Sequence, residues 1–113
     1  KSGFDIIPYT SDYYPESFQK IAFYAEIYNS DKVIGENESY LITYFIESFE
    51  TNKIISNYKS FSKEVAKPVN IVLKSFTIES LPSGNYNLVI EARNKNNDLL
   101  IDKKIFYQRS NPK

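Results

Sequence analysis

Four residue types are missing from this chain: cysteine, histidine, methionine and tryptophan. Without cysteine the chain has no disulfide and no thiolate metal ligand. Without histidine as well, it lacks a Ser–His–Asp triad, a cysteine nucleophile and the usual ligands of zinc. These absences exclude the commonest hydrolytic mechanisms. We therefore expect a protein that is not an enzyme, with no catalytic residue, no metal ligand and no cofactor.

Glycine is scarce as well, and the three glycines are isolated, so no glycine-rich loop is available to hold phosphate. Nine glutamates and five aspartates leave a carboxylate pair for glycoside hydrolysis open on composition alone. Glu26, Glu47 and Glu91 are candidates for such a pair. All three fall within expected strands, where the ordinary interpretation of a glutamate is a solvated face.

The charges balance: Lys plus Arg and Asp plus Glu each total 14. A nucleic-acid-binding protein normally carries a basic excess that neutralises phosphates, so no nucleic-acid partner is expected. No apolar run approaches the length of about 20 residues that a membrane-spanning helix needs, so no membrane insertion is expected. The 113 residues suit a single domain. Because the chain starts at Lys1 and contains no methionine, we expect residues 1–113 to be a mature form or one module excised from a longer protein.

Aromatic and β-branched residues are plentiful, and they favour β-structure. Ten tyrosines and eight phenylalanines accompany many isoleucines and valines. Apolar residues recur with period two, and asparagine and serine cluster between the apolar runs. This pattern predicts seven strands, at residues 4–9, 20–29, 40–49, 53–61, 69–78, 85–94 and 99–108. No helical pattern separates them, so an all-β, antiparallel, immunoglobulin-like sandwich is the natural arrangement.

Alternation also predicts which side chains share a face. One face of the second strand collects Ile21, Phe23, Ala25 and Ile27, and the other collects Tyr24, Glu26 and Tyr28. Residues 40–49 are apolar on both faces, which is typical of a central, covered strand. In the fifth strand, Val69, Ile71 and Leu73 lie on one side. Residues 11–18 are expected to form a loop, and a small excursion is expected at Val33 and Ile34.

The segment "LPSGNY", residues 81–86, predicts a structural corner. Pro82 fixes its φ near −65°, and Gly84 accepts a positive φ without steric cost. Leu81 is then free to enter the core, and Tyr86 to return its hydroxyl to the backbone upstream. This is the tyrosine corner of immunoglobulin-like sandwiches. The alternative is an ordinary glycine-containing loop beside a core tyrosine.

The stretch "LPSGNYNLVIEARNKNNDLLIDKKIFY" resembles the last two strands of fibronectin-type-III or immunoglobulin-like modules in bacterial envelope proteins. Modules of Bacteroidetes surface and periplasmic proteins, including those beside GWxTD domains, have a similar L-P-x-G-x-Y corner. The upstream "FYAEIYNSD" is similar to an early strand of such modules. The resemblance implies a sandwich located in the periplasm, at the cell surface or outside the cell. It carries over no catalytic residue.

The surplus of tyrosine is the remaining functional signal. We expect at least two of Tyr24, Tyr28, Tyr40 and Tyr44 to be partly exposed on one sheet face, with the two pairs brought together by strand pairing. The alternative is that tyrosines line the sandwich edge with their hydroxyls in water. The same two alternatives, a contact face or a solvated edge, apply to the loop residues Tyr9, Tyr13 and Tyr14.

Two classes of function are therefore open. The first is a structural or interaction module that contacts neighbouring domains of the parent chain or other envelope proteins. The second is a ligand-binding domain, for carbohydrate or for another ligand. Oxygen-rich stretches at residues 29–38 and 94–98 also leave a calcium site open, although turn formation by asparagine and aspartate explains both.

Overall fold

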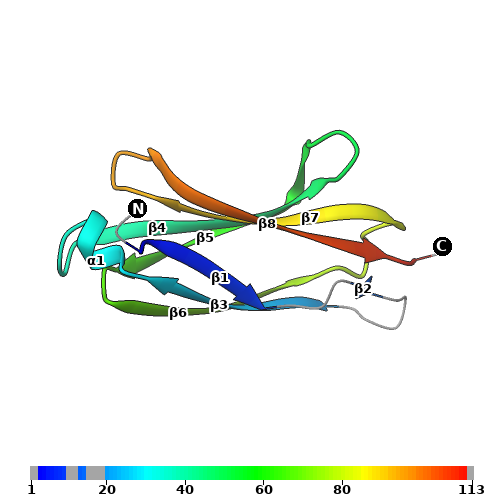
Figure 1. Cartoon of the computed structure of the whole chain (residues 1–113). Helices are drawn as coiled ribbons and strands as arrows, with labels where there is room; N and C mark the ends of the chain where they lie inside the picture. Colours follow the sequence, from blue (N-terminus) through cyan, green and yellow to red (C-terminus); the bar gives the residue numbers. More distant parts are fainter. Residues whose placement is uncertain (1–2, 10–12, 15–19, 112–113) are drawn as a thin grey trace.

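A computed structural model describes residues 3–9, 13–14 and 20–111, and in it two β-sheets pack face to face (Figure 1). The elements in chain order are β1 (Asp5–Tyr9), β2 (Tyr13–Tyr14), β3 (Lys20–Tyr28), α1 (Ser30–Val33), β4 (Ser39–Ser48), β5 (Ile54–Val65), β6 (Val69–Thr77), β7 (Gly84–Arg93) and β8 (Leu99–Arg109). The predicted all-β sandwich is confirmed.

The two sheets differ in size and divide the strands unequally. The smaller sheet has the order β1-β3-β6, and the larger has the order β2-β8-β7-β4-β5. Every pairing is antiparallel except the two-residue pairing of β2 with β8. The sandwich is elongated, measuring 48 × 21 × 20 Å. The first and last described strands start and finish at opposite ends of it (Figure 1).

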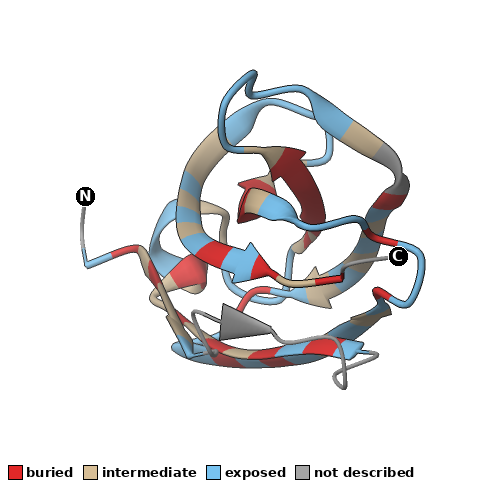
Figure 2. Cartoon of the chain, turned by 90° about the vertical axis from the view of Figure 1, so that its right-hand side faces the viewer, coloured by how far each residue is buried: buried red, intermediate tan, exposed pale blue. Residues whose placement is uncertain are grey.

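The core lies between the sheets and follows the period-two pattern. Burial alternates along β3 as predicted, and burying each large aliphatic side chain contributes about 1.5–3 kcal/mol. The end-on view of Figure 2 shows buried and exposed segments alternating along the smaller sheet. The largest fully buried side chains are Tyr40, Tyr107, Phe23, Ile6, Ile21, Ile27, Ile42, Ile46, Ile78, Leu81, Leu88 and Ile90.

Strand β4 is central, as its sequence predicts. It lies between β5 and β7, and its residues 42–47 are buried without interruption. Two predictions about other segments were wrong. Residues 13–14 were expected in a loop, but they form β2. The sequence did not reveal this strand, because a pairing of only two residues leaves no alternation to detect. Strand β5 continues to Val65 instead of ending near residue 61, because its polar end pairs with the start of β4, Val65 opposite Ser39.

Asparagine makes the tight turns of this chain more often than glycine does. Asn29, Asn37, Asn52 and Asn97 all have φ between 58° and 68°. Asparagine tolerates this left-handed conformation better than other residues with a side chain. Asn29 leads into α1, a single helical turn at the position where a small excursion was expected. This turn carries the chain from the smaller sheet to the larger one.

The predicted corner is present, with one correction. The Tyr86 hydroxyl donates a 2.8 Å hydrogen bond to the Pro82 carbonyl, and Leu81 is buried. Gly84 does not have the positive φ that was predicted; the positive-φ glycines of the described chain are Gly3 and Gly35. The sharp turn lies earlier, where the Leu81 amide donates to the Ile78 carbonyl at 3.0 Å. Gly84 already belongs to β7, so its backbone is extended.

Hydrogen bonds from the end of β8 connect this corner to the larger sheet. Arg109 is only 4% exposed, and its guanidinium donates to the carbonyls of Ile78 and Leu81. The Asn111 side chain donates to the carbonyls of Glu79 and Leu81. Carbonyls that the turn leaves without a strand partner are thereby satisfied, as buried backbone requires.

A buried polar cluster fixes the opposite end of the sandwich. The side-chain oxygen of Asn70 accepts hydrogen bonds from the hydroxyls of Tyr40 and Ser30, each at 2.7 Å, and its amide donates to the Val65 carbonyl at 2.9 Å. Ser30 also accepts a bond from the Lys67 amide at 3.0 Å. Burial raises the pKa of Tyr40 to about 12. The cluster ties α1 and β4 to the connection between β5 and β6.

Candidate functional site

The four tyrosines predicted to share a contact face are divided between the two sheets. Tyr24 and Tyr28 lie half-buried on the outer side of β3, whereas Tyr40 and Tyr44 enter the core and are 1% and 7% exposed. The predicted pairing of their strands is wrong, because β3 pairs with β1 and β6 while β4 pairs with β5 and β7. Only the β3 half of the predicted contact face exists.

That half belongs to a larger surface, which we call the apolar face. It is the outer side of the three-stranded sheet. Strand register places its side chains in rows: Tyr28 lies between Asp5 and Val69, Glu26 between Ile7 and Ile71, and Tyr24 between Tyr9 and Leu73. The aliphatic residues of β6 share one side as predicted, and that side is the solvent side: Val69, Ile71 and Leu73 are 41%, 55% and 69% exposed.

The centre of the apolar face is rigidly arranged. The Tyr24 and Tyr28 hydroxyls both donate to the Glu26 carboxylate, at 2.9 and 2.5 Å. The bond to Glu26 raises the pKa of Tyr28 to about 12, and it raises that of Tyr24 as well. The bonds from Tyr28 and Tyr24 lower the pKa of Glu26. The Tyr24 ring also packs on Tyr9, with 5.7 Å between centroids. These rings are therefore held in place before any partner arrives.

The outer side of the five-stranded sheet forms a second surface, which we call the concave face. In Figure 1 the turn between β4 and β5 and the turn between β7 and β8 both rise on this side of the sheet. Register places its outward residues in rows across β8, β7, β4 and β5. From one end to the other these rows are Phe106–Asn87–Glu47–Ile54, Lys104–Val89–Phe45–Lys59, Asp102–Glu91–Thr43–Phe61 and Leu99–Arg93–Leu41–Lys63.

The floor of the concave face is buried and polar. Glu47 and Glu91 are 4% and 9% exposed, so the solvated positions expected for them were wrong. Their burial follows from the curvature of the sheet, which alternation along a single strand does not reveal. Glu47 accepts hydrogen bonds from Asn87 and Lys104, each at 2.9 Å, and Glu91 pairs with Arg93 at 2.9 Å. Glu26, the third carboxylate, lies on the opposite face of the molecule.

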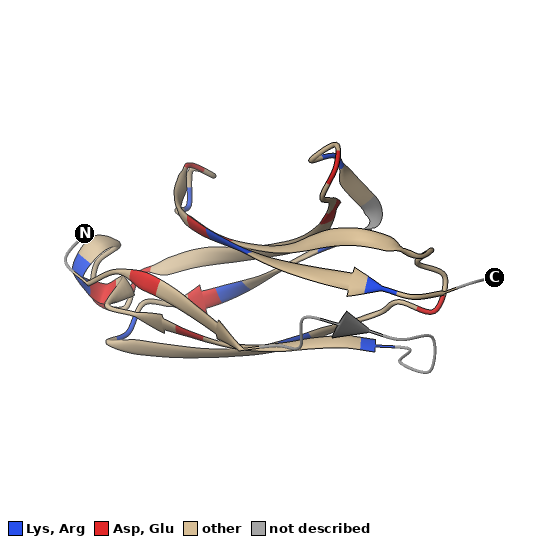
Figure 3. Cartoon of the chain, turned by 45° about the vertical axis from the view of Figure 1, so that its right-hand side comes forward, with Lys and Arg blue, Asp and Glu red and all other residues tan. Residues whose placement is uncertain are grey.

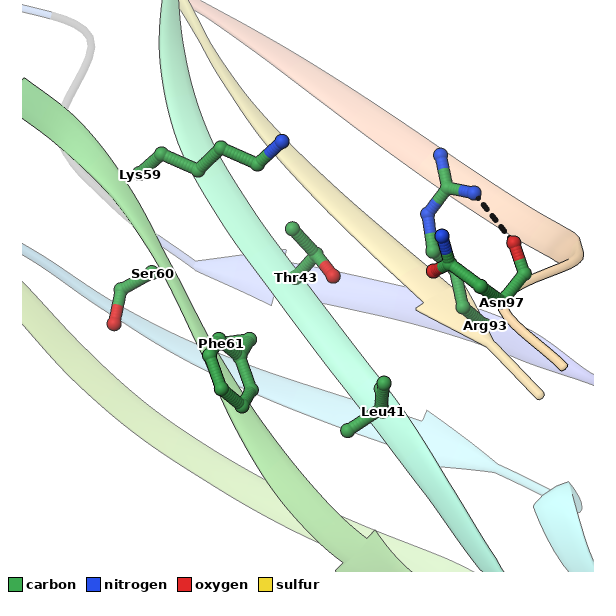
Figure 4. A pocket seen from close by; sticks show the side chains of 7 residues that line it. All are labelled: Leu41, Thr43, Lys59, Ser60, Phe61, Arg93 and Asn97. Carbon is green, nitrogen blue, oxygen red and sulfur yellow. Dashed lines mark hydrogen bonds between the residues drawn. The ribbon is translucent and has the colours of Figure 1, made fainter. Parts of the chain in front are cut away.

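One end of the concave face is hollowed into a pocket of about 430 Å³. Its floor comes from Leu41 and Thr43 of β4, one wall from β5, and the other from Arg93 and the β7–β8 turn (Figure 4). Phe61, on the β5 wall, is 67% exposed. Sequence reasoning missed this wall. Its signal was the run "KSFSK", residues 59–63, which alternates long and short side chains along a strand.

Charges of both signs are interspersed along the strands (Figure 3). Among the described residues, no group of three or more acidic side chains is placed to hold a metal ion. In the stretch 94–98, the Asn94 side-chain oxygen accepts hydrogen bonds from the amides of Asn96 and Asp98, which is a turn-forming role. The side chains of Tyr13 and Tyr14 lie outside the described part of the chain. No described helix is long and apolar enough to cross a membrane.

Comparison with known proteins gives no family. No protein-family model matches the chain, and no curated protein matches its sequence. Among solved structures, a β-glucosidase from Kluyveromyces marxianus in complex with glucose contains a similar region, with a TM-score of 0.43 and 14% identity. The match covers 94% of this chain and 15% of that enzyme. A likeness at this level assigns neither family nor function.

Proposed function

We propose that the chain is a non-catalytic, immunoglobulin-like interaction module of a bacterial cell-envelope or secreted protein, with the apolar face as its contact surface. Its partner is a folded protein surface, namely a neighbouring domain of the same polypeptide or another envelope protein. The absence of cysteine and histidine supports the non-catalytic part.

The exposed aliphatic row of β6 carries this proposal. An outward strand side ordinarily carries polar residues when one face of a sheet meets water. Here Val69, Ile71 and Leu73 occupy it, with the Tyr9 ring, 53% exposed, on the same face. Contiguous exposed apolar surface of this kind marks contact sites in soluble proteins.

The composition of the apolar face also suits a protein partner. Core residues of protein interfaces are enriched in aromatic side chains and depleted of charge. The carboxylate of Glu26 is its central charge, and both of its oxygens already accept hydrogen bonds from tyrosines. Because Tyr24 and Tyr28 are fixed by these bonds, they lose little rotamer freedom on binding, which favours affinity.

The topology supports the immunoglobulin-like part. When β1, β3 and β6 are named A, B and E, and β8, β7, β4 and β5 are named G, F, C and C′, the sheets read A-B-E and G-F-C-C′. Immunoglobulin-like sandwiches pair these strands in the same way, and the tyrosine corner lies near the start of strand F, where Tyr86 is found. Strands that start and finish at opposite ends suit modules strung end to end (Figure 1).

Because the chain has no cysteine, a single introduced cysteine reports on one position. We would compare maleimide labelling of Leu73→Cys with that of Asn96→Cys, an exposed position on the β7–β8 turn. In purified protein both should react readily. In cells of the source organism, native contacts should slow labelling of Leu73→Cys about tenfold or more, the ratio that corresponds to burial in a contact worth about 1.4 kcal/mol. Equal labelling of both positions in cells would contradict the proposal.

A further inference from the structure

The concave face has features that contact through the apolar face does not use. Its floor holds two charge pairs, Glu47 with Lys104 and Glu91 with Arg93. The exposed Asp102 lies beside Glu91 at the β8 edge, and Lys59 and Lys63 stand on the opposite β5 edge. The glutamates are more than nine-tenths buried although no second sheet covers them. Burying carboxylates is costly unless they are paired and hydrogen-bonded, and here they are. A stable sandwich needs no such floor, so its arrangement points to a role beyond folding.

The charged groups of the floor are held by hydrogen bonds to one another and to the backbone. Asn87 and Lys104 both bind Oε2 of Glu47. The Arg93 guanidinium is held from two sides. Its Nη1 donates to the Asn97 carbonyl at 2.9 Å (Figure 4), and its Nε donates to Glu91 at 2.9 Å. Fixed planar donors and acceptors of this kind suit adjacent hydroxyl groups, because each can serve two oxygens of a ligand at once. The Thr43 hydroxyl lies on the same floor.

The β5 wall adds an aromatic ring between two cations. Lys59, Phe61 and Lys63 are two residues apart on one strand, so all three face the concave side, and all are exposed. The Lys59 ammonium lies 5.8 Å above the Phe45 ring, a cation–π contact. Within the described chain neither lysine forms an ion pair. The wall therefore offers an apolar ring face with unneutralised positive charge on each side.

We infer that the pocket of the concave face binds an acidic oligosaccharide, one that contains uronate residues. The C–H face of a sugar ring packs on Phe61, a uronate carboxylate meets Lys59 or Lys63, and hydroxyl groups meet Thr43, Arg93 and the Asn97 side chain. A volume of about 430 Å³ lies within the usual range for small-ligand sites.

Other ligand classes fit this surface less well. A nucleic acid would bring dense negative charge over the buried carboxylates of Glu47 and Glu91, in a chain with no net positive charge. A neutral sugar would leave the two wall lysines without a counter-charge. An acidic peptide would neutralise the lysines, but it has no ring of hydroxyl groups for the polar floor. A uronate oligosaccharide satisfies the ring, the cations and the floor together.

The test is a titration of the isotopically labelled protein, followed by amide chemical shifts. The probes are tetrasaccharides that contain galacturonate, mannuronate or glucuronate, each paired with its methyl-esterified form, which keeps the ring and hydroxyls but removes the charge. At least one acidic form should shift the amides of Thr43, Phe61 and Arg93. Its esterified form should bind about tenfold more weakly, and added salt should weaken the acidic form.

Four variants test whether the ligand occupies this pocket. Phe61→Ala and Lys59→Gln should each weaken binding about tenfold, the loss expected for one contact of ordinary strength. Lys53→Gln removes a lysine from the β4–β5 turn and should leave binding unchanged. Leu73→Ser, on the apolar face, should also leave it unchanged, so the outcome is independent of the proposed function. Thermal unfolding of each variant checks that the fold is retained.

Several results would overturn the inference. The first is the absence of shifts with all three acidic tetrasaccharides at up to about 5 mM, a concentration at which a ligand with a Kd of about 1 mM would occupy most of the protein. The others are shifts confined to the apolar face, and equal binding of the charged and esterified forms. Equal or tighter binding of oligo-dT or of an oligoglutamate peptide would assign the pocket to nucleic acid or to acidic peptides instead.

Discussion

Replacing Tyr86 with phenylalanine removes one oxygen from the corner between β6 and β7. The hydroxyl that is lost donates a 2.8 Å hydrogen bond to the Pro82 carbonyl, while the ring stays packed against Tyr107 with 5.8 Å between centroids. The side chain is 6% exposed, so the ring position is set by the core and not by the hydroxyl. The substitution therefore tests the hydrogen bond and little else.

The expected cost follows from where the two partners lie. A net hydrogen bond contributes about 0.5–1.5 kcal/mol, and a buried partner left unsatisfied costs about 1–3 kcal/mol. Pro82 is exposed, so water can reach its carbonyl after the substitution. We therefore expect about 1–1.5 kcal/mol. At about 2.1 cal/mol/K of unfolding entropy per residue, this lowers the melting temperature of a 113-residue chain by about 4–6 °C.

The assay is urea unfolding of wild type and Tyr86→Phe, with Tyr9→Phe as the matched control. Tyr9 is 53% exposed, so its variant should stay within about 0.5 kcal/mol of wild type. With m of about 1–3 kcal/mol/M, the Tyr86→Phe midpoint should fall by about 0.3–1.5 M. Midpoints that coincide for Tyr86→Phe and wild type would refute the structural role of this hydrogen bond.

Three further predictions follow from the turns, the buried cluster and the apolar face. Gly84→Ala should be nearly neutral in thermal unfolding, since its new Cβ would meet the Tyr86 side chain at ordinary contact distances, 3.4–3.5 Å. Gly35→Ala should cost about 1 kcal/mol or more, because φ there is 115°, a backbone conformation that is strained for any residue with a side chain. Asn70→Leu should destabilise by about 2–4 kcal/mol in urea, since two hydroxyls lose their shared acceptor; a loss below about 1 kcal/mol would contradict the cluster. In a pH titration by NMR, the pKa of Tyr28 should be about 12 and that of Glu26 should lie below its ordinary 4.5. The stabilisation from their bond should therefore be complete between the ordinary values, 4.5 and 10.0, and should be lost as pH rises from 10.0 through about 12 or falls from 4.5 through the lowered Glu26 value. Ordinary pKa values for both groups would show that the bond is not formed in solution.

The fold was largely predictable because its signals are local. Alternation along β3 placed Ile21, Phe23, Ala25 and Ile27 in the core without knowledge of any other strand. The length of "YLITYFIESF" and its apolar character on both faces indicated a central strand, and β4 is one. The assignment of strands to sheets was harder. The single turn of α1 separates β3 from β4, and nothing local distinguishes it from a hairpin turn.

The candidate surfaces were less predictable, because they depend on non-local geometry. Period two groups Val69 with Ile71 and Leu73, but it does not tell which side of the strand meets the core. Glu47 and Glu91 looked like solvated residues because the curvature that buries them arises from β4, β5, β7 and β8 together. Gly84 suggested a positive φ by its residue type, whereas the turn is closed by backbone hydrogen bonding between Ile78 and Leu81.

The central claim is that the apolar face is a contact surface, and a charge placed on it tests the claim most directly. In the Leu73→Cys background, Ile71→Lys puts an ammonium beside the probe at a position that is 55% exposed, so the fold should survive. Thr51→Lys, on the exposed β4–β5 turn, is the matched control. In cells of the source organism, Ile71→Lys should restore maleimide labelling of Leu73→Cys to the rate of the purified protein, while Thr51→Lys should leave it protected. Labelling that Ile71→Lys does not change, with the fold intact, would contradict the account.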